Sequence, residues 1–329
     1  EFAPTSTGLL ADTIEIQYND GAVVQTSNRD VQGTGGAPAL LDVGGPDPYD
    51  FGTLANGSTT PVVLTVTNSG AVTATSMADG LGLAAPFDWV GGTYPGAAGT
   101  CGATLAAAAS CDIEVQYNPS ALGTLSDDVE ISYNDGAGLQ TMIHGLTGTA
   151  AAPASLAITE ADPYDYGSIA VGATSAHTFT VSNSGGVAAT AIVESGIAAP
   201  FQYTGGAYPG TAGTCGVSIT AGGSCDIEIE FAPGATGLLS DTIDIAYNNG
   251  VSTVNVTRDV QGTGLAPAVL AISETDPYDY GTNPTSSVTQ HIFTITNTGG
   301  APATGMAGSG LASPFRFEGG AYPGTSGDC

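Results

Sequence analysis

Residues 225–231 read CDIEIEF, and residues 241–247 read DTIDIAY. In both stretches apolar and polar residues alternate, which places the apolar side chains on one face of an extended strand. The turn sequence Asn248-Asn249-Gly250 follows the second stretch, and alternation resumes at Val254. The pattern predicts two neighbouring strands of an antiparallel hairpin with one buried face.

The chain repeats this pattern along its length. The motif DPYD begins at Asp47, Asp162 and Asp276, which gives steps of 115 and 114 residues. A period of that length is a whole domain, because solenoid and propeller repeats are roughly 20 to 50 residues long. We predict complete repeats at 36–150 and 151–264, flanked by the last part of a repeat at 1–35 and the first part of another at 265–329.

The two incomplete repeats together lack the residues equivalent to 216–229. Glu1-Phe2-Ala3-Pro4 repeats the sequence pattern of 230–233, and Cys329 is equivalent to Cys215. Two interpretations follow: the sequence is a piece of a longer array, or the end fragments of neighbouring chains combine into one shared domain. We favour the longer array, because the missing residues include a cysteine and most of a strand, and a shared domain would have a gap in its core.

Each repeat holds several further alternating stretches and turn signals. Residues 62–68, 176–183 and 291–297 alternate and end in Asn-(Ser/Thr)-Gly turns. The Asn-Asp-Gly sequences at 19–21 and 134–136 are typical of short hairpins, because type I′ turns need residues that accept positive φ. Helical periodicity is nearly absent. Seven or eight short strands per repeat predict an all-β fold of tandem immunoglobulin-like antiparallel β-sandwich domains.

The motifs of each repeat follow one another in a fixed order. In the first complete repeat they are DPYDFG (47–52), TNSG (67–70), APF (85–87), SCDIEVQYNP (110–119), GTLSDDVEISYNDG (123–136) and GTA (148–150). In this order of motifs the chain resembles the choice-of-anchor D repeat, a bacterial immunoglobulin-like domain in the wider group that includes hydin-like repeats. The resemblance covers essentially the whole chain, and it implies an exported or cell-surface protein with no catalytic residues.

The composition is strongly acidic. The chain has three Arg, no Lys and 31 Asp plus Glu, for a net charge of −28. We expect no nucleic-acid partner, because phosphate binding needs clustered cationic side chains. The absence of lysine excludes Schiff-base chemistry and a phosphate-loop lysine. No apolar run is long enough to cross a bilayer, so we expect no membrane insertion in this sequence.

The cysteines recur with a fixed spacing. Cys101 and Cys111, and likewise Cys215 and Cys225, are ten residues apart, and Cys329 takes the first position of a third pair. This pattern predicts one local disulfide per complete repeat, with the partner of Cys329 beyond residue 329. A zinc site is the alternative, but two thiols per repeat do not fill four coordination positions. We therefore expect an oxidising, extracellular or cell-surface location.

The DPYD segments are candidate calcium sites. Calcium prefers carboxylate and carbonyl oxygens and stiffens junctions between domains. The alternative is that proline fixes a turn, an aspartate caps it by accepting backbone N–H bonds, and tyrosine packs into the core. The candidate calcium ligands are Asp47, Asp50, Glu160, Asp162, Asp165, Glu274, Asp276 and Asp279.

Other conspicuous residues have structural interpretations. His177 and His291 share a repeat position with Val62, which argues against a metal-ligand role. Arg258 and the preceding repeat's His144 share another position, and we expect a surface ion pair between Arg258 and the adjacent Asp259. Trp89, Tyr203 and Phe317 occupy a single aromatic position that we expect to be packed in the core.

A second acidic group lies on the predicted strands. Asp112 and Glu114 recur as Asp226 and Glu228, and alternation places them on the solvent face of the sheet. Like charges on facing strands are unfavourable. Surface solubility is the expected role, with salt screening or cation binding as the alternatives.

These observations predict a structural rather than a catalytic protein. We expect an extracellular fibre, stalk or surface filament whose partners are neighbouring repeats or copies of the same chain in a linear assembly. The alternative is an adhesin that binds a carbohydrate or protein through its sandwich loops. The close similarity of corresponding loops, such as the Tyr-Pro-Gly sequences at 94–96, 208–210 and 322–324, favours the structural role.

Overall fold

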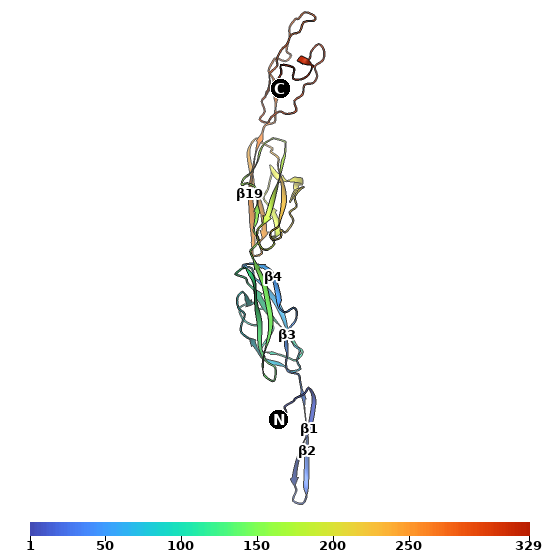
Figure 1. Cartoon of the computed structure of the whole chain (residues 1–329), viewed down its shortest axis with the longest axis vertical. Helices are drawn as coiled ribbons and strands as arrows, with labels where there is room; N and C mark the ends of the chain where they lie inside the picture. Colours follow the sequence, from blue (N-terminus) through green and yellow to red (C-terminus); the bar gives the residue numbers. More distant parts are fainter. The chain divides into compact units, whose positions relative to one another are not determined.

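The computed structural model describes residues 1–329 and contains strands with two short 3₁₀ turns (Figure 1). It divides into two compact units, one mainly of residues 1–154 and the other mainly of residues 155–329. The elements are β1(Gly8–Asn19), β2(Val24–Gly35), β3(Leu41–Val43), β4(Tyr49–Ala55), β5(Thr60–Asn68), β6(Ala74–Asp79), β7(Phe87–Trp89), β8(Thr104–Leu105), β9(Ser110–Tyr117), β10(Gly123–Asn134), β11(Leu139–Ala151), β12(Leu156–Ile158), β13(Tyr164–Ala170), β14(Ser175–Asn183), β15(Thr190–Ser195), β16(Phe201–Tyr203), η1(Thr204–Gly206), β17(Ser224–Phe231), β18(Gly237–Asn248), β19(Thr253–Leu265), β20(Leu270–Ile272), β21(Ile295–Asn297) and η2(Glu318–Gly320).

Each complete repeat is a sandwich of two sheets. In the first, one sheet has the order β4-β11-β10-β6-β8 and the other the order β3-β5-β9-β7. In the second, the corresponding orders are β13-β19-β18-β15 and β12-β14-β17-β16. The predicted all-β, immunoglobulin-like fold is therefore confirmed.

One pairing in each sandwich differs from the antiparallel prediction. Strand β4 runs parallel to β11, and β13 runs parallel to β19. In both repeats the strand that begins at the tyrosine of the DPYD motif lies beside the last strand of the repeat. The parallel arrangement arises because the chain enters a repeat near one end of its last strand and leaves at the other end.

The predicted hairpins form, but with longer loops than a two-residue type I′ turn. Four residues, 135–138, connect β10 and β11. The Asp135 carboxylate accepts the backbone N–H groups of Ala137 and Gly138, both at 2.7 Å. Gly136 has a φ of 95°, which glycine adopts without steric cost. The side chain of Asp135 therefore organises the loop that the glycine signal predicted.

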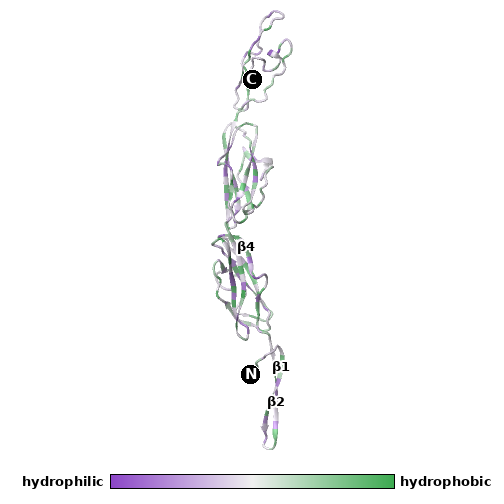
Figure 2. Cartoon of the chain, in the orientation of Figure 1, coloured by the Kyte–Doolittle hydropathy of each residue, from purple (hydrophilic) through white to green (hydrophobic).

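Hydrophobic and hydrophilic residues alternate along the strands (Figure 2), and the hydrophobic ones of the two sheets form the core. On β17, Ile227, Ile229 and Phe231 are fully buried, whereas the intervening acidic residues are not. The rings of Phe231 and Phe201 stack with centroids 4.8 Å apart. The equivalent rings in the first repeat, Tyr117 and Phe87, are 4.9 Å apart. The same aromatic pair thus occupies the centre of both sandwiches.

A glycine on the last strand makes room for this aromatic pair. A Cβ at Gly262 would lie 2.5 Å from the Phe231 ring, and one at Gly148 would lie 2.8 Å from the Tyr117 ring. The Tyr117 hydroxyl donates a hydrogen bond to the Gly148 carbonyl at 3.2 Å. The recurring Gly-Thr sequence at the end of each repeat therefore reflects close packing of backbone on ring.

The N-terminal hairpin β1–β2 has the same strand pairing as the hairpin β18–β19 of the second complete repeat. Strands β1 and β2 pair from Gly8↔Gly35 to Asn19↔Val24, as β18 and β19 do over the equivalent residues. Ile14 is 50% exposed, whereas its equivalent, Ile243, is fully buried. The apolar face of β1–β2 is therefore the face that a complete repeat packs into its core.

No helix of the structure is long and apolar enough to span a membrane.

The core assignment is tested by truncating Phe231. The substitution Phe231→Ala removes a fully buried ring, and we expect it to lower the free energy of unfolding of its repeat by about 3 to 5 kcal/mol. Leu238→Ala is the control, because Leu238 is 66% exposed and its truncation leaves no cavity. Chemical denaturation followed by tyrosine fluorescence measures both variants; equal losses would contradict the predicted core.

Candidate functional site

Each complete repeat contains the predicted disulfide. Cys101 is bonded to Cys111, and Cys215 to Cys225. In each pair the first cysteine lies in a loop and the second near the start of β9 or β17. A ring of ten residues stabilises its domain by about 2 to 3 kcal/mol, chiefly by restricting the unfolded chain. Cys329 is exposed and forms no disulfide within residues 1–329, and its partner remains a prediction.

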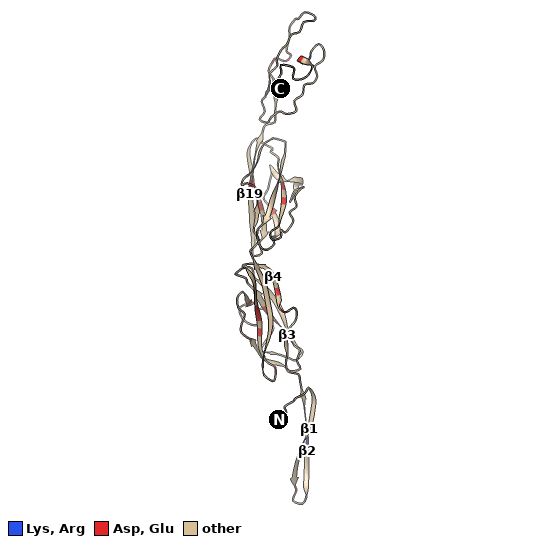
Figure 3. Cartoon of the chain, viewed as in Figure 1, with Lys and Arg blue, Asp and Glu red and all other residues tan.

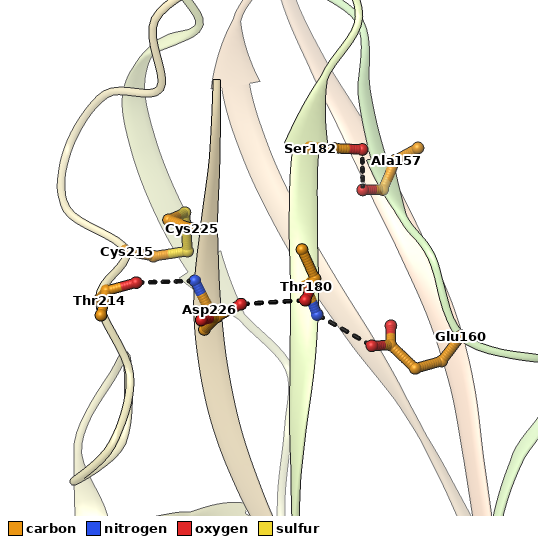
Figure 4. The surroundings of a disulfide bond; sticks show 8 residues. All are labelled: Ala157, Glu160, Thr180, Ser182, Thr214, Cys215, Cys225 and Asp226. Carbon is orange, nitrogen blue, oxygen red and sulfur yellow. Dashed lines mark hydrogen bonds between the residues drawn. A yellow bond between two sulfur atoms is a disulfide. The ribbon is translucent and has the colours of Figure 1, made fainter. Parts of the chain in front are cut away.

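Hydrogen bonds extend from the disulfide across the sheet (Figure 4). The Thr214 hydroxyl accepts the backbone N–H of Asp226 at 2.9 Å. The Asp226 carboxylate accepts the hydroxyl of Thr180 at 3.0 Å, and the Thr180 backbone N–H donates to Glu160 at 3.0 Å. The aspartate beside the second cysteine therefore joins β17 to β14, and Glu160 joins β14 to the end of β12.

The first aspartate of each DPYD motif bonds the last strand of its own repeat. The Asp47 carboxylate accepts the backbone N–H of Gly145 on β11 at 2.8 Å. The Asp162 carboxylate accepts the backbone N–H of Asp259 on β19 at 3.1 Å. These bonds are the aspartate caps that we expect if the motif forms a turn rather than a calcium site. The capped N–H group, however, lies far away in the sequence.

The second aspartate of each motif makes a local turn. Asp50, Asp165 and Asp279 each accept the backbone N–H of the glycine two residues later, at 2.7 to 2.8 Å. The tyrosine between the two aspartates packs against other aromatic rings, as Tyr164 does against Tyr166 with centroids 5.0 Å apart. The motif therefore combines a turn, a cap and a packed ring.

The structure does not assemble the candidate calcium ligands into one group. Nowhere in residues 1–329 do three His, Cys, Asp or Glu side chains come close enough together to hold a metal ion. Glu274 accepts a bond from His291 at 3.3 Å, and Asp276 is exposed. The observed contacts match backbone capping, and calcium binding remains a prediction.

The cation of the second repeat pairs with a different acid from the one predicted. The Arg258 guanidinium lies 3.4 Å from the Asp162 carboxylate and also donates to the Ile158 carbonyl. Asp259 instead accepts the hydroxyl of Thr242 at 2.7 Å. The expected Arg258–Asp259 pair is wrong because consecutive side chains on a strand point to opposite faces. In the first repeat His144 takes this place, 4.0 Å from Asp47.

Acidic residues lie on several strands of both sandwiches (Figure 3), and some of them bond the loops of their repeat. Glu114 and Glu228 accept the backbone N–H groups of Ala98 and Ala212, at 2.7 and 3.0 Å. Two β-strand aspartates bond a different loop, the one before β7 or β16: Asp127 accepts from Ala84 at 2.6 Å, and Asp241 from Ala198 at 2.8 Å. Solubility alone does not account for these acids.

The electrostatics of Glu228 reflect this role. The Thr204 hydroxyl and the Ala212 backbone N–H both donate to its carboxylate and lower the pKa of Glu228 below its ordinary value of 4.5. Donors favour the charged form of a carboxyl group. The loop bonds of Glu228 are therefore strongest when the side chain is ionised.

His177 and His291 stack on the DPYD tyrosines and do not gather metal ligands. The imidazole of His177 lies 4.0 Å from the ring of Tyr164, and that of His291 lies 4.1 Å from the ring of Tyr278. In the first repeat Val62 stands at the histidine position, and Gly45 stands at the position of Glu160 and Glu274. The histidine and this glutamate are therefore both present in the two later repeats and both absent from the first.

The aromatic position is packed, as expected, and also hydrogen-bonded. Trp89 is 3% exposed, and its indole N–H donates to the Asp79 carboxylate at 3.0 Å. Tyr94 packs edge-on against Trp89 at 5.3 Å. Burial and the nearby Asp79 raise the pKa of Tyr94 to about 12. This cluster packs the loop that carries Tyr94 against the sheet.

Sequence reasoning missed the loop bonds of the strand acids and the link from Asp47 to β11. One signal was available: Asp127, Glu114 and their equivalents recur at the same repeat positions despite the large negative charge. Their partners are backbone N–H groups, which no residue type marks. Only the folded chain shows which amide each carboxylate meets.

These features define a tandem immunoglobulin-like β-sandwich protein in which disulfides and carboxylate–backbone hydrogen bonds secure each domain. The model of the HYDIN/CFA65/VesB-like, Ig-like domain family matches residues 45–145 and 158–263. The two matches cover more than half of the chain, and the chain belongs to this family. The resemblance to the hydin-related group is thereby confirmed. No curated protein matches the chain.

Several solved structures are similar to the chain at low identity. A protein of unknown function from Porphyromonas gingivalis W83 is 12% identical, with 68% of this chain and 99% of that chain covered and a TM-score of 0.27. The VesB protease of Vibrio cholerae is 18% identical, with coverages of 34% and 32% and a TM-score of 0.28. PapD-like domain 7 of human CEP192 is 16% identical, with coverages of 35% and 88% and a TM-score of 0.27.

The loop bond of Glu228 predicts an acid-dependent loss of stability. Because the folded-state pKa is lowered, the stabilisation by Glu228 is fully present above the unfolded pKa and is lost as pH falls through the folded pKa. We expect Glu228→Gln to be less stable than the native chain at pH 7, and the difference to shrink below about pH 4.5.

Urea denaturation at a series of pH values measures this difference. Glu230→Gln is the matched control on the same strand, because Glu230 bonds the side chain of Gln202 rather than the loop backbone. A difference between native chain and Glu228→Gln that does not change with pH would refute the assignment.

Removal of divalent cations distinguishes the two interpretations of the DPYD turns. If backbone N–H groups satisfy Asp47 and Asp162, EDTA leaves the melting temperature unchanged, and added calcium has no effect. Calcium binding would instead lower the melting temperature on EDTA treatment and restore it on calcium addition. Differential scanning calorimetry of the whole chain measures this, with magnesium as the control for ionic strength.

Proposed function

We propose that the chain is a structural segment of an extracellular bacterial fibre, stalk or surface filament. Its partners are neighbouring repeats or further copies of the chain in a linear assembly. The observation that carries the proposal is that each complete repeat has its own core, its own disulfide and the same set of loop bonds. Such self-sufficient domains suit a protein whose function depends on geometry.

The equivalence of the loops supports a structural role over recognition. Glu114 and Glu228 hold equivalent loop amides, as do Asp127 and Asp241. An adhesin would be expected to vary these loops between repeats. Here the same bonds constrain the loop in both repeats, and the proposal assigns no catalytic residues.

The disulfides and the charge support the extracellular location. Disulfides form and persist in oxidising compartments. A net charge of −28 keeps acidic surfaces from associating without specificity. Together they suit repeats that are exposed at high local density outside the cell.

Negative-stain electron microscopy of the native assembly tests the proposal. We expect uniform fibres whose axial spacing corresponds to one repeat. Isolated globular particles would overturn the structural role. Binding of immobilised carbohydrate or protein by such particles would support the adhesin instead.

A further inference from the structure

The DPYD motif has a partner that its turn geometry does not require. A turn is capped by an N–H group close in sequence, as Asp50 is by Gly52. The first aspartate instead bonds a strand almost one hundred residues later, in both complete repeats. The strand that begins at the tyrosine of the motif pairs parallel with that same last strand. We call this pairing of β4 with β11, and of β13 with β19, the terminal seam.

The chain enters and leaves the first repeat at opposite ends of the seam. The Ala39 backbone N–H bonds the Asp135 carbonyl at 2.9 Å, beside the turn that begins β11. Strand β11 ends at Ala151, whose carbonyl accepts the Asn56 backbone N–H at 2.7 Å. The first strand therefore starts at one end of the sandwich, and the last strand finishes at the other.

Parallel pairing with this layout determines how tension acts. A pull on the ends of the repeat draws β4 toward its N-terminus and β11 toward its C-terminus. The two strands must slide past each other, so the hydrogen bonds of the seam are loaded together rather than one after another. The pairing extends from Tyr49↔Leu146 to Ala55↔Ala151. Strand β3, with only three paired positions, offers less resistance.

At both ends of the seam lie further hydrogen bonds that are not part of the strand pairing itself. In the first repeat these are the Asp47–Gly145 bond at 2.8 Å and the Asn56–Ala151 bond at 2.7 Å. The second repeat has Asp162 bonded to Asp259 at 3.1 Å at one end and a bond from Val171 to Leu265 at 2.8 Å at the other.

The second repeat reinforces its seam further. The Gln261 amide donates to Asp165 at 3.2 Å, so both aspartates of DPYD reach β19. Arg258 adds its ion pair with Asp162 at 3.4 Å. Hydrogen bonds to ionised groups are stronger than neutral ones. The acids of the motif thus lie at the end of the seam where β13 would begin to slide past β19.

From this geometry we propose that the terminal seam resists mechanical unfolding of each repeat when the chain is pulled by its ends. The hydrogen bonds of Asp47 and Asp162 hold the end of the seam at which β4 and β13 begin. The inference rests on the proposed structural function, because only a chain under tension uses such an element. It assigns to the DPYD motif a mechanical role that neither turn formation nor calcium binding includes.

Single-molecule force spectroscopy of the whole chain, held by its two ends, tests the proposal. Two cooperative unfolding events are expected, one per complete repeat. Each lengthens by about 3 nm when the disulfides are reduced, because reduction frees ten residues. Under a fixed force, the double variant Asp47→Ala/Asp162→Ala should unfold about tenfold faster than the native chain.

The matched control is Asp127→Ala/Asp241→Ala. It removes the same charge and the same kind of carboxylate–backbone bond, at 2.6 and 2.8 Å, but from the loop before β7 or β16, outside the seam. Urea denaturation establishes that both double variants fold and how far each is destabilised. The seam variant also loses the Arg258–Asp162 ion pair, so its unfolding rate under force is compared with its own loss in urea. We expect the seam variant alone to unfold faster under force than its loss in urea accounts for.

Two results would overturn the proposal: a seam variant with the native lifetime under force, or a loop variant whose lifetime falls as far as that of the seam variant. The force measurement and the electron microscopy test different proposals. If the chain forms fibres but the seam variant has the native lifetime under force, the structural function stands and the seam proposal fails. If the seam variant unfolds faster but the native material forms isolated particles, the seam proposal stands and the structural function fails.

Discussion

Burial of one alternating stripe of side chains between two sheets is the interaction on which the rest of this structure depends. Ile227, Ile229 and Phe231 on β17 reach the core only because their neighbours point outward. The same alternation sends Asp226, Glu228 and Glu230 to the other face, where they meet loop and strand donors. Packing therefore determines where the acids lie, and the acids then determine how the loops are held.

The high negative charge follows from this arrangement. Many of the acidic side chains accept backbone N–H groups, and each such bond favours the ionised form. Glu228 bonds the loop that carries Cys215, and Asp162 bonds the last strand. The carboxylates thus connect strands to loops and to other strands within each repeat while they remain at the solvated surface.

Much of the fold could be predicted from the sequence, because alternation, glycine turns and cysteine spacing are local signals. The strands around Cys225, the hairpin after Tyr247 and both disulfides are examples. The pairing of β13 with β19 was not predictable, because the residues involved lie far apart in the chain and parallel pairing leaves no turn between them. The Arg258–Asp162 pair was missed for the same reason.

The sequence by itself determined the all-β class, the repeat, the disulfide pairs and the inward face of each strand, since all of these follow from the order and spacing of residue types. The tertiary structure alone decided which backbone amide each carboxylate meets and which strand lies beside DPYD. An aspartate can cap any nearby N–H group. Only the pairing of β11 with β4, and of β19 with β13, brings the amides of Gly145 and Asp259 to Asp47 and Asp162.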